Sequence, residues 1–381
     1  MPVPFIDLRR FEPDFLDRWA SRCAQLTAET RFVSPPEVGE IEEAIAERCG
    51  LAHGVACANG TDALQLALRA VGVGPGDRVL LPDATFWATY EAVVNCGGSP
   101  VTVDVDPGDL QMDFDLFVEA VAAHRPKAVL LVHLYGWGSA RIGEFRTFCR
   151  EHDLPLVEDG AQIFGSQLSQ PAGDPVPFLA GAQVATLSFY PAKVLGACGD
   201  AGMVLCDDPQ LATTLRQLGN HGRTSHYGYG LVGWNSRMGG FEAAYLTLSL
   251  GYFGPRLASR QRAAERYREQ LAEPRFTEAG VETVAPPVGQ IENGYLNVIR
   301  VDPERRPTIQ DGLKARGIGT GIVYPGSLSR QPGAEGTLAG RLGGEHADQL
   351  CRSVLNLPLF AHITDDEVDE VVAALAGVLE V

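Results

Sequence analysis

One lysine of this chain stands where an amine could do covalent chemistry. Lys193 ends the run SFYPAK, residues 188–193, and glycines follow at positions 196, 199 and 202. The apolar stretch 184–189 predicts a buried strand, so the lysine lies where a strand gives way to a glycine-bearing turn. Burial lowers the pKa of an amine, and a deprotonated amine attacks the aldehyde of pyridoxal phosphate to form a Schiff base. An isolated lysine after a strand is more often an exposed surface residue, so neighbouring signals decide between the two interpretations.

A second signal is a helix start suited to phosphate. The segment NGTD, residues 59–62, opens the helical run ALQLAL. Gly60 followed by Thr61 at a helix start offers free backbone N–H groups and the positive end of the helix dipole, which together bind phosphate. Thr61 or Asp62 is also explained as a simple N-cap. Ser188, which precedes Lys193 by five residues, can add a hydroxyl to the same phosphate.

An acid, an amide and an aromatic ring follow other predicted strands. Asp159 ends an apolar strand, where open α/β sheets bind ligands, and its carboxylate can keep the pyridine nitrogen of the cofactor protonated. Gln162 can donate to the phenolic oxygen of the cofactor, and Phe86 can stack on its ring. Asp159 is also explained as a turn cap and Phe86 as a core residue. Together with Lys193, these groups at strand ends fit one cofactor better than separate coincidences.

The elements expected to position these residues alternate between strands and helices from residue 50 to residue 210. Such alternation predicts βαβ units, and runs that are apolar throughout predict parallel strands covered on both faces. We therefore expect a large α/β domain, residues 1–254, built as a three-layer α/β/α sandwich with a mostly parallel sheet. Strands are expected at 78–81, 101–105, 128–134, 155–158, 184–189 and 201–206, and helices at 62–71, 88–96, 116–124, 142–152 and 209–218.

The pattern changes near residue 253. A long charged helix, 257–271, leads into segments at 294–301 and 320–324 and a C-terminal amphipathic helix that begins near Thr364. We interpret residues 255–381 as a smaller α+β domain. The Pro- and Gly-rich stretch 170–181 is expected to be a surface excursion between strands.

Composition excludes several classes of function. A formal net charge of −17 argues against a nucleic-acid surface, which needs clustered Lys and Arg. An anionic small substrate would need local cations, for which Arg223, Arg237 and Arg330 are candidates, although solvated surface charge explains them too. The eight cysteines form no CxxC pair and the eight histidines no HxH or HxxxH pair, so we expect neither a metal site nor disulfides.

Neither a membrane span nor a secretory signal is expected. The sequence has no run of about 18 uncharged apolar residues, and its first residues, MPVPFIDLRR, lack a charged head before an apolar core. We expect a cytoplasmic protein.

Several segments, taken in order, resemble the DegT/DnrJ/EryC1/StrS family of pyridoxal-phosphate-dependent sugar aminotransferases. They are NGTDALQLAL, PDATFWAT, EDGAQIFGS, SFYPAKVLGACGDAG, NHGR and GWNSRM, and the likeness runs from PFIDL near the start to LNLPL near residue 355. The resemblance implies the fold type I architecture of aspartate aminotransferase. It also implies amino transfer from L-glutamate to a nucleotide-linked keto sugar, in a homodimer with shared active sites.

The resemblance also implies roles for individual residues. Lys193 would carry the cofactor, Asp159 would pair with the pyridinium, Phe86 would lie over the ring and Gln162 would touch the phenolic oxygen. The phosphate would be bound by Gly60, Thr61 and Ser188.

Other roles implied by the resemblance belong to the subunit boundary and the substrate. Asn235 would reach the phosphate of the neighbouring subunit, with Arg237 beside it at the shared site. Tyr324 would lie near the sugar. His221, in NHGR, would follow a subunit-contact loop, or merely end the helix before it.

Departures from the family pattern leave the substrate open. Gly160 and Ala201 replace other small residues and should not disturb the cofactor, whereas Val323 and Gly239 replace a frequent histidine and aspartate nearer the substrate. An aminotransferase acting on a cyclitol ketone is an alternative, because the same motifs serve both substrates. A sugar dehydratase is disfavoured because that branch carries histidine in place of the lysine. A non-catalytic pyridoxal-phosphate-binding regulator would not need the base that Lys193 supplies.

Overall fold

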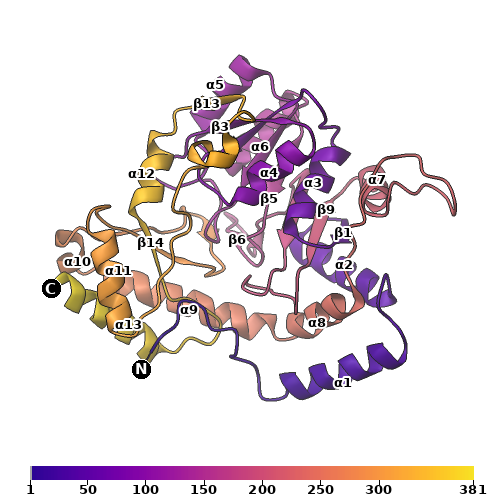
Figure 1. Cartoon of the computed structure of the whole chain (residues 1–381). Helices are drawn as coiled ribbons and strands as arrows, with labels where there is room; N and C mark the ends of the chain where they lie inside the picture. The colour runs from indigo at the N-terminus through magenta and orange to yellow at the C-terminus, as the bar shows by residue number, and fades with distance from the viewer. Residues whose placement is uncertain (1) are drawn as a thin grey trace.

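The computed structural model describes residues 2–381, and its largest unit is an eight-stranded sheet (Figure 1). The strand order is β1-β9-β8-β5-β4-β2-β3-β13. Within this sheet β9 alone runs against the other strands, because it pairs antiparallel with both β1 and β8. The strands are β1 His53–Cys57, β2 Arg78–Pro82, β3 Ser99–Val103, β4 Ala128–Val132, β5 Leu156–Asp159, β8 Val184–Ser188, β9 Gly202–Cys206 and β13 Gly340–Leu342.

Helices cover both faces of this sheet. Successive strand side chains point to opposite faces, so Leu80 and Leu81 of β2 belong to two different apolar clusters. One cluster includes α3 Gly60–Ala70, α4 Trp87–Asn95 and α7 Pro209–Gly219; the other includes α2 Pro36–Cys49, α5 Phe114–His124, α6 Ile142–Glu151 and α8 Gly240–Leu250. The expected three-layer α/β/α sandwich with a mostly parallel sheet is confirmed.

The C-terminal part of the chain has an apolar cluster of its own. A three-stranded antiparallel sheet, β10-β12-β14, lies there with four helices. These elements are α9 Phe253–Leu271, α10 Pro274–Glu278, β10 Glu282–Thr283, β12 Asn297–Arg300, α11 Arg306–Ala315, β14 Val354–Leu357 and α13 Asp365–Leu379.

The predicted boundary after residue 254 is crossed in both directions. Residues 340–342, assigned from the sequence to the smaller domain, form β13 and pair with β3 at the edge of the large sheet. In the other direction, Val3 joins the C-terminal cluster. The division after residue 254 therefore stays a prediction.

The remaining elements are short or lie at the edges. The expected excursion 170–181 carries β7 Val176–Pro177, which forms a small sheet with β6 Gln167–Leu168 and β11 Gln290–Ile291. The segment 320–324 forms no strand, and its Gly321 makes an isolated bridge to Asn356. The others are α1 Phe15–Ala28, two short 3₁₀ helices at Leu328–Arg330 and Pro332–Ala334, and α12 Glu345–Ser353. Within residues 2–381 no helix combines the length and apolarity that a bilayer crossing requires.

Candidate active site

A cavity of about 390 Å³ lies where β4, β5 and β8 end at their carboxyl termini. This is the edge at which open α/β sheets bind ligands. Eight of the predicted site residues border the cavity, and so does Val323: the eight are Gly60, Thr61, Phe86, Asp159, Gln162, Ser188, Lys193 and Tyr324. The fold thus brings together residues that are far apart in the chain.

Lys193 is placed by a loop that folds back on the end of β8. The amide of Phe189 donates to Ala201 at 2.8 Å, and the amide of Ala197 donates back to Phe189 at 2.7 Å. Gly196 permits the tight turn, since a Cβ there would lie 2.4 Å from the carbonyl oxygen of Pro191. The half-buried lysine points its Nζ at the ring of Tyr295, 5.0 Å from the centroid.

Asp159 lies buried at the end of β5 with two neutral donors. Its Oδ2 accepts from Thr89 Oγ1 at 3.0 Å, and its Oδ1 accepts from the amide of Ala161 at 3.1 Å. Burial raises the pKa of Asp159, and the two donors, together with weaker electrostatic effects of Lys193 and His133, only partly oppose that rise. A cation brought into the cavity, such as a protonated ring nitrogen, would supply the charge partner that this carboxylate needs.

The first turn of α3 faces the same cavity. Asn59 caps the helix: its Oδ1 accepts from the amide of Asp62 at 2.8 Å and its carbonyl accepts from Ala63 at 3.0 Å. The amides of Gly60 and Thr61 therefore have no acceptor within the helix. Glycine is needed at the first position, because a Cβ on Gly60 would lie 2.7 Å from the Cβ of Ser188. Two free amides, a helix N-terminus and a serine hydroxyl fit a phosphate group.

Gln162 and Tyr324 line the cavity beside Phe86. Gln162 Oε1 accepts from the amide of Tyr135 at 2.7 Å, which turns its Nε2 towards the hydroxyl of Tyr324 at 3.2 Å. The rings of Phe86 and Tyr324 lie 5.5 Å apart at 35°. Phe86 is 54% exposed, so its phenyl face is free to stack on a planar ligand. The residues around the cavity therefore fit pyridoxal phosphate.

Three predicted residues lie outside this cavity. Asn235, Arg237 and His221 belong to the segment between α7 and α8, part of which projects from the body of the molecule (Figure 1). Arg237 donates to Asn235 Oδ1 at 2.6 Å and to Asn220 Oδ1 at 3.0 Å, and the amide of His221 donates to Trp234 at 2.8 Å. Their predicted role at a neighbouring subunit stays a prediction, because the structure contains one chain.

The two other candidate arginines do not border the cavity either. Arg223 lies over the ring of Tyr229, 5.9 Å from its centroid. Arg330 forms an ion pair with Asp348 at 3.4 Å. Neither supplies a cation to the cavity of its own chain.

Thr89 and Tyr295 contact predicted site residues but were not identified as site residues from the sequence. Thr89 donates a hydrogen bond to Asp159. It follows Phe86 by three residues, about one helical turn, so this spacing was a signal that could have placed Thr89 on the same side of α4 as the site. Tyr295, which faces Lys193, comes from the C-terminal part of the chain and carries no local signal.

A buried ionic network stands behind the strand that carries Asp159. Glu158 accepts from Arg146 Nε and from His133 Nε2, both at 2.8 Å. Burial alone would raise the pKa of Glu158, but Arg146 and His133 hold it at about 2. The network ties β5 to α6 and to the residue that follows β4.

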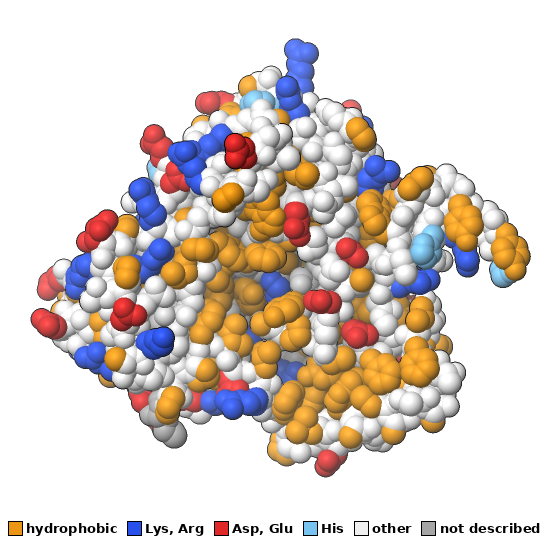
Figure 2. Space-filling model, viewed as in Figure 1, with side chains coloured by type: hydrophobic (Ala, Val, Ile, Leu, Met, Phe, Trp, Pro, Cys, Tyr) orange, Lys and Arg blue, Asp and Glu red, His pale blue; other side chains and the backbone are white. Residues whose placement is uncertain are grey.

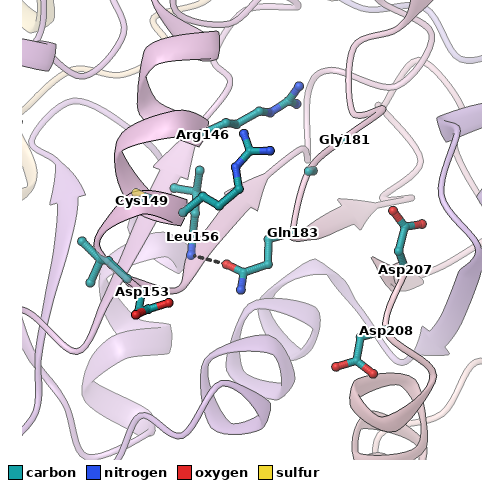
Figure 3. A pocket seen from close by; sticks show the side chains of 11 residues that line it. Arg146, Cys149, Asp153, Leu156, Gly181, Gln183, Asp207 and Asp208 are labelled. Carbon is teal, nitrogen blue, oxygen red and sulfur yellow. Dashed lines mark hydrogen bonds between the residues drawn. The ribbon is translucent and has the colours of Figure 1, made fainter.

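A second pocket, of about 460 Å³, lies at the opposite edge of the sheet, near the first residues of β5 and β8 (Figure 3). Three of its polar side chains have structural roles. Gln183 accepts from the amide of Leu156 at 2.9 Å, Asp207 from that of Ala52 at 2.8 Å, and Asp208 caps α7. None of the residues predicted to be functional lines this pocket.

The model of the DegT/DnrJ/EryC1/StrS aminotransferase family matches residues 17–376. The chain belongs to this family. Its members use pyridoxal 5′-phosphate, so the chain is a pyridoxal-phosphate-dependent transaminase, as the sequence predicted.

Known relatives resemble the chain over nearly its full length. A Pseudomonas aeruginosa protein named UDP-2-acetamido-2-deoxy-3-oxo-D-glucuronate aminotransferase is 33% identical, with 98% of this chain and 100% of the relative covered. A Bacillus subtilis protein named 3-oxo-glucose-6-phosphate:glutamate aminotransferase is 30% identical, with 99% and 84% covered. The crystal structure of S. venezuelae DesV superimposes with a TM-score of 0.91 at 32% identity, covering 100% of this chain and 99% of that one. These full-length matches also support the fold type I architecture.

Proposed function

We propose that this transaminase converts a nucleotide-linked keto sugar to the amino sugar, with L-glutamate as the amino donor. The single observation that carries the proposal is the cavity in which Lys193, Asp159 and the α3 helix start converge. The substrate class is supported by the name of the Pseudomonas relative, and the donor by the name of the Bacillus relative.

The residues of the cavity have distinct parts in holding the cofactor. Lys193 would bind it covalently through Nζ, and Asp159 would pair with the ring nitrogen. Phe86 would lie against the ring, while Gln162 would donate to the phenolic oxygen, because its Oε1 is already occupied by Tyr135. The phosphate would accept from the amides of Gly60 and Thr61 and from the hydroxyl of Ser188.

Lys193 would also move protons. When bound, pyridoxal phosphate supplies an aldehyde that accepts an amino group and a cationic ring that stabilises negative charge on the adjacent carbon. Released by the incoming donor, Lys193 Nζ would take the proton from the donor's α-carbon, and in the second half of the cycle it would return a proton to the sugar carbon that is aminated. Asp159 would support both halves by remaining ionised beside the ring nitrogen, and Tyr324 would face the sugar.

The proposed active unit is a homodimer. Apolar side chains gather over the region where α1 and α8 lie (Figure 2), and Phe32 and Val33 there are 48% and 63% exposed. Val33 forms a bridge with Gly239, so this surface is continuous with the segment of Asn235 and Arg237. A second copy covering it would bring that segment to a neighbouring site. We also propose a cytoplasmic location, where the eight free cysteines would stay reduced.

The test follows the cofactor spectrum of the purified holoenzyme. Glutamate should bleach the absorbance of the lysine-bound cofactor, and a nucleotide keto sugar should restore it. Replacing Lys193 by Ala should reduce turnover by a factor of about 10⁴ or more, whereas Lys127→Ala, at an exposed lysine, should not.

A panel of nucleotide keto sugars, sugar phosphates and cyclitol ketones narrows the substrate. Recovery with nucleotide sugars is expected, while recovery with cyclitol ketones alone would replace the proposed substrate. A spectrum indifferent to glutamate would contradict the proposed donor.

A further inference from the structure

The hydroxyl of Ser236 joins the two sides of the turn that carries Gly60 and Thr61. It donates to Asp62 Oδ2 at 2.6 Å and accepts from the amide of Ala58 at 3.2 Å. Ala58 precedes the turn and Asp62 follows it, while Ser236 itself is only 2% exposed. One buried hydroxyl therefore holds both ends of the phosphate-facing turn.

This bridge complements the cap on the other side of the turn. Asn59 Oδ1 accepts from the amide of Asp62 at 2.8 Å, so Asp62 is held through its backbone by Asn59 and through its carboxylate by Ser236. With both contacts made, the amides of Gly60 and Thr61 stay directed at the cavity, where an anion can accept from them.

The same serine belongs to the segment that carries Asn235. Its neighbour Asn235 is exposed, and Asn235 Oδ1 accepts from Arg237 at 2.6 Å. The amide of Ser236 donates to Gly219 at 2.9 Å, and a Cβ on Gly219 would lie 2.9 Å from the carbonyl oxygen of Ser236. Because both the hydroxyl and the backbone of Ser236 are hydrogen-bonded, the backbone of the neighbouring Asn235 is held in place at the surface.

We propose that Ser236 is a positioning residue for both phosphate sites of the homodimer. It braces the turn of Gly60 and Thr61 in its own subunit and sets the position of Asn235 for the site of its partner. The inference rests on the proposed function, in which Asn235 reaches the phosphate of the neighbouring subunit. A single hydroxyl would then serve both phosphate sites.

The first test titrates pyridoxal phosphate into the cofactor-free protein. Ser236→Ala should weaken binding about tenfold, because Asp62 and the amide of Ala58 lose a buried partner. Ser236→Thr keeps a hydroxyl and should recover most of the affinity. The matched control is Ser249→Ala, which removes a buried hydroxyl that has no hydrogen-bond partner among residues 2–381. Normal affinity in Ser236→Ala, or an equal loss in Ser249→Ala, would overturn the proposal.

The second test separates the two sites with mixed dimers. A chain carrying Lys193→Ala cannot bind the cofactor covalently, so a dimer with one such chain has a single site that borohydride can label. Ser236→Ala is placed either on the chain that keeps Lys193 or on the chain that lacks it. Occupancy at limiting cofactor should fall in both arrangements, as measured by mass spectrometry of the labelled chain. A fall in only one arrangement would refute the double role.

A third mixed dimer distinguishes a failure of this inference from a failure of the proposed function. Asn235→Ala is placed on the chain that lacks Lys193, with subunit exchange confirmed. If occupancy of the intact site does not fall, the shared active site of the proposed function is wrong. If it falls with Asn235→Ala but not with Ser236→Ala in the same position, only the role of Ser236 is wrong.

Discussion

Asp159 accepts no hydrogen bond from a charged residue among residues 2–381, and Lys193 and His133 act on it only through longer-range electrostatics. Its two donors, Thr89 and the amide of Ala161, are neutral, and burial raises the pKa of the carboxyl group. The native cofactor-free state therefore favours the protonated acid more than the unfolded state does. Such a group stabilises the fold at low pH, and this contribution is lost as the pH rises through the raised pKa.

The raised pKa of Asp159 predicts that Asp159→Asn stabilises the cofactor-free fold but impairs function. The amide stays neutral, so the cofactor-free variant should unfold about 1–2 °C higher than the parent at pH 8, with a smaller difference at pH 5. Its affinity for pyridoxal phosphate and its turnover should fall. Thermal unfolding of both cofactor-free proteins at the two pH values measures the effect, and a stability difference that shrinks as the pH rises would contradict it.

Site residues could be predicted from the sequence when they stand at the end of a strand or helix that the local pattern marks. Lys193, Asp159 and Gly60 stand at strand or helix ends that the sequence marks, and the structure brings them to one cavity. Tyr295 could not be found in this way, because its place opposite Lys193 is set by packing of the C-terminal part. The proposed role of Asn235 at a neighbouring site involves a second chain, so it cannot follow from one fold.

At the scale of elements, the strands that end at the site were predictable within one or two residues. Their apolar runs are continuous because both faces are buried, so β2 and β8 match the expected segments at 78–81 and 184–189 closely. β13 was not predicted, since three residues give no periodicity and the strand exists only by pairing with β3.

The start of α3 gives the first prediction at this scale. Gly60→Ala should weaken pyridoxal phosphate binding by about tenfold, because the added Cβ would lie 2.7 Å from Ser188 and displace the phosphate-facing amides. Gly39→Ala is the matched control, since Gly39 lies in α2 and a Cβ added there meets nothing within 4 Å. Equilibrium titration of the cofactor-free variants measures both, and equal affinity in the two would argue against a phosphate site here.

The buried ionic network of Glu158, Arg146 and His133 gives the second prediction at this scale. Arg146→Leu leaves Glu158 buried without its main charge partner and should cost about 3 kcal/mol of unfolding free energy. Adding Glu158→Gln removes the unpaired charge, so the double variant should regain much of the loss. Denaturant unfolding of the single and double variants measures this, and a double variant no more stable than Arg146→Leu would exclude the electrostatic explanation.

At the scale of the whole molecule, the surface around α1 and α8 is the one proposed to meet a second subunit. Phe32 stacks on Phe241 with ring centroids 6.2 Å apart at 4°, yet Phe32 remains 48% exposed. Large exposed aromatic side chains beside a functional segment mark interaction surfaces on soluble proteins.

Phe32→Glu should therefore separate the proposed dimer. A charge at this position should weaken association by about 30-fold, and because each site would then lack Asn235 of a neighbour, cofactor retention should fall as well. Val288→Glu serves as the control, because Val288 is fully exposed in the loop that precedes β11. Light scattering coupled to gel filtration measures the mass, and an unchanged dimer in Phe32→Glu would show that the subunits meet elsewhere.

The central claim is that Lys193 holds the cofactor. The chain contains three lysines, at positions 127, 193 and 314, and the other two are exposed on the surface. Reducing the holoenzyme with borohydride and mapping the digest by mass spectrometry tests the claim directly. We expect one equivalent of reduced cofactor on the peptide that contains Lys193; an adduct on Lys127 or Lys314, or none at all, would contradict it.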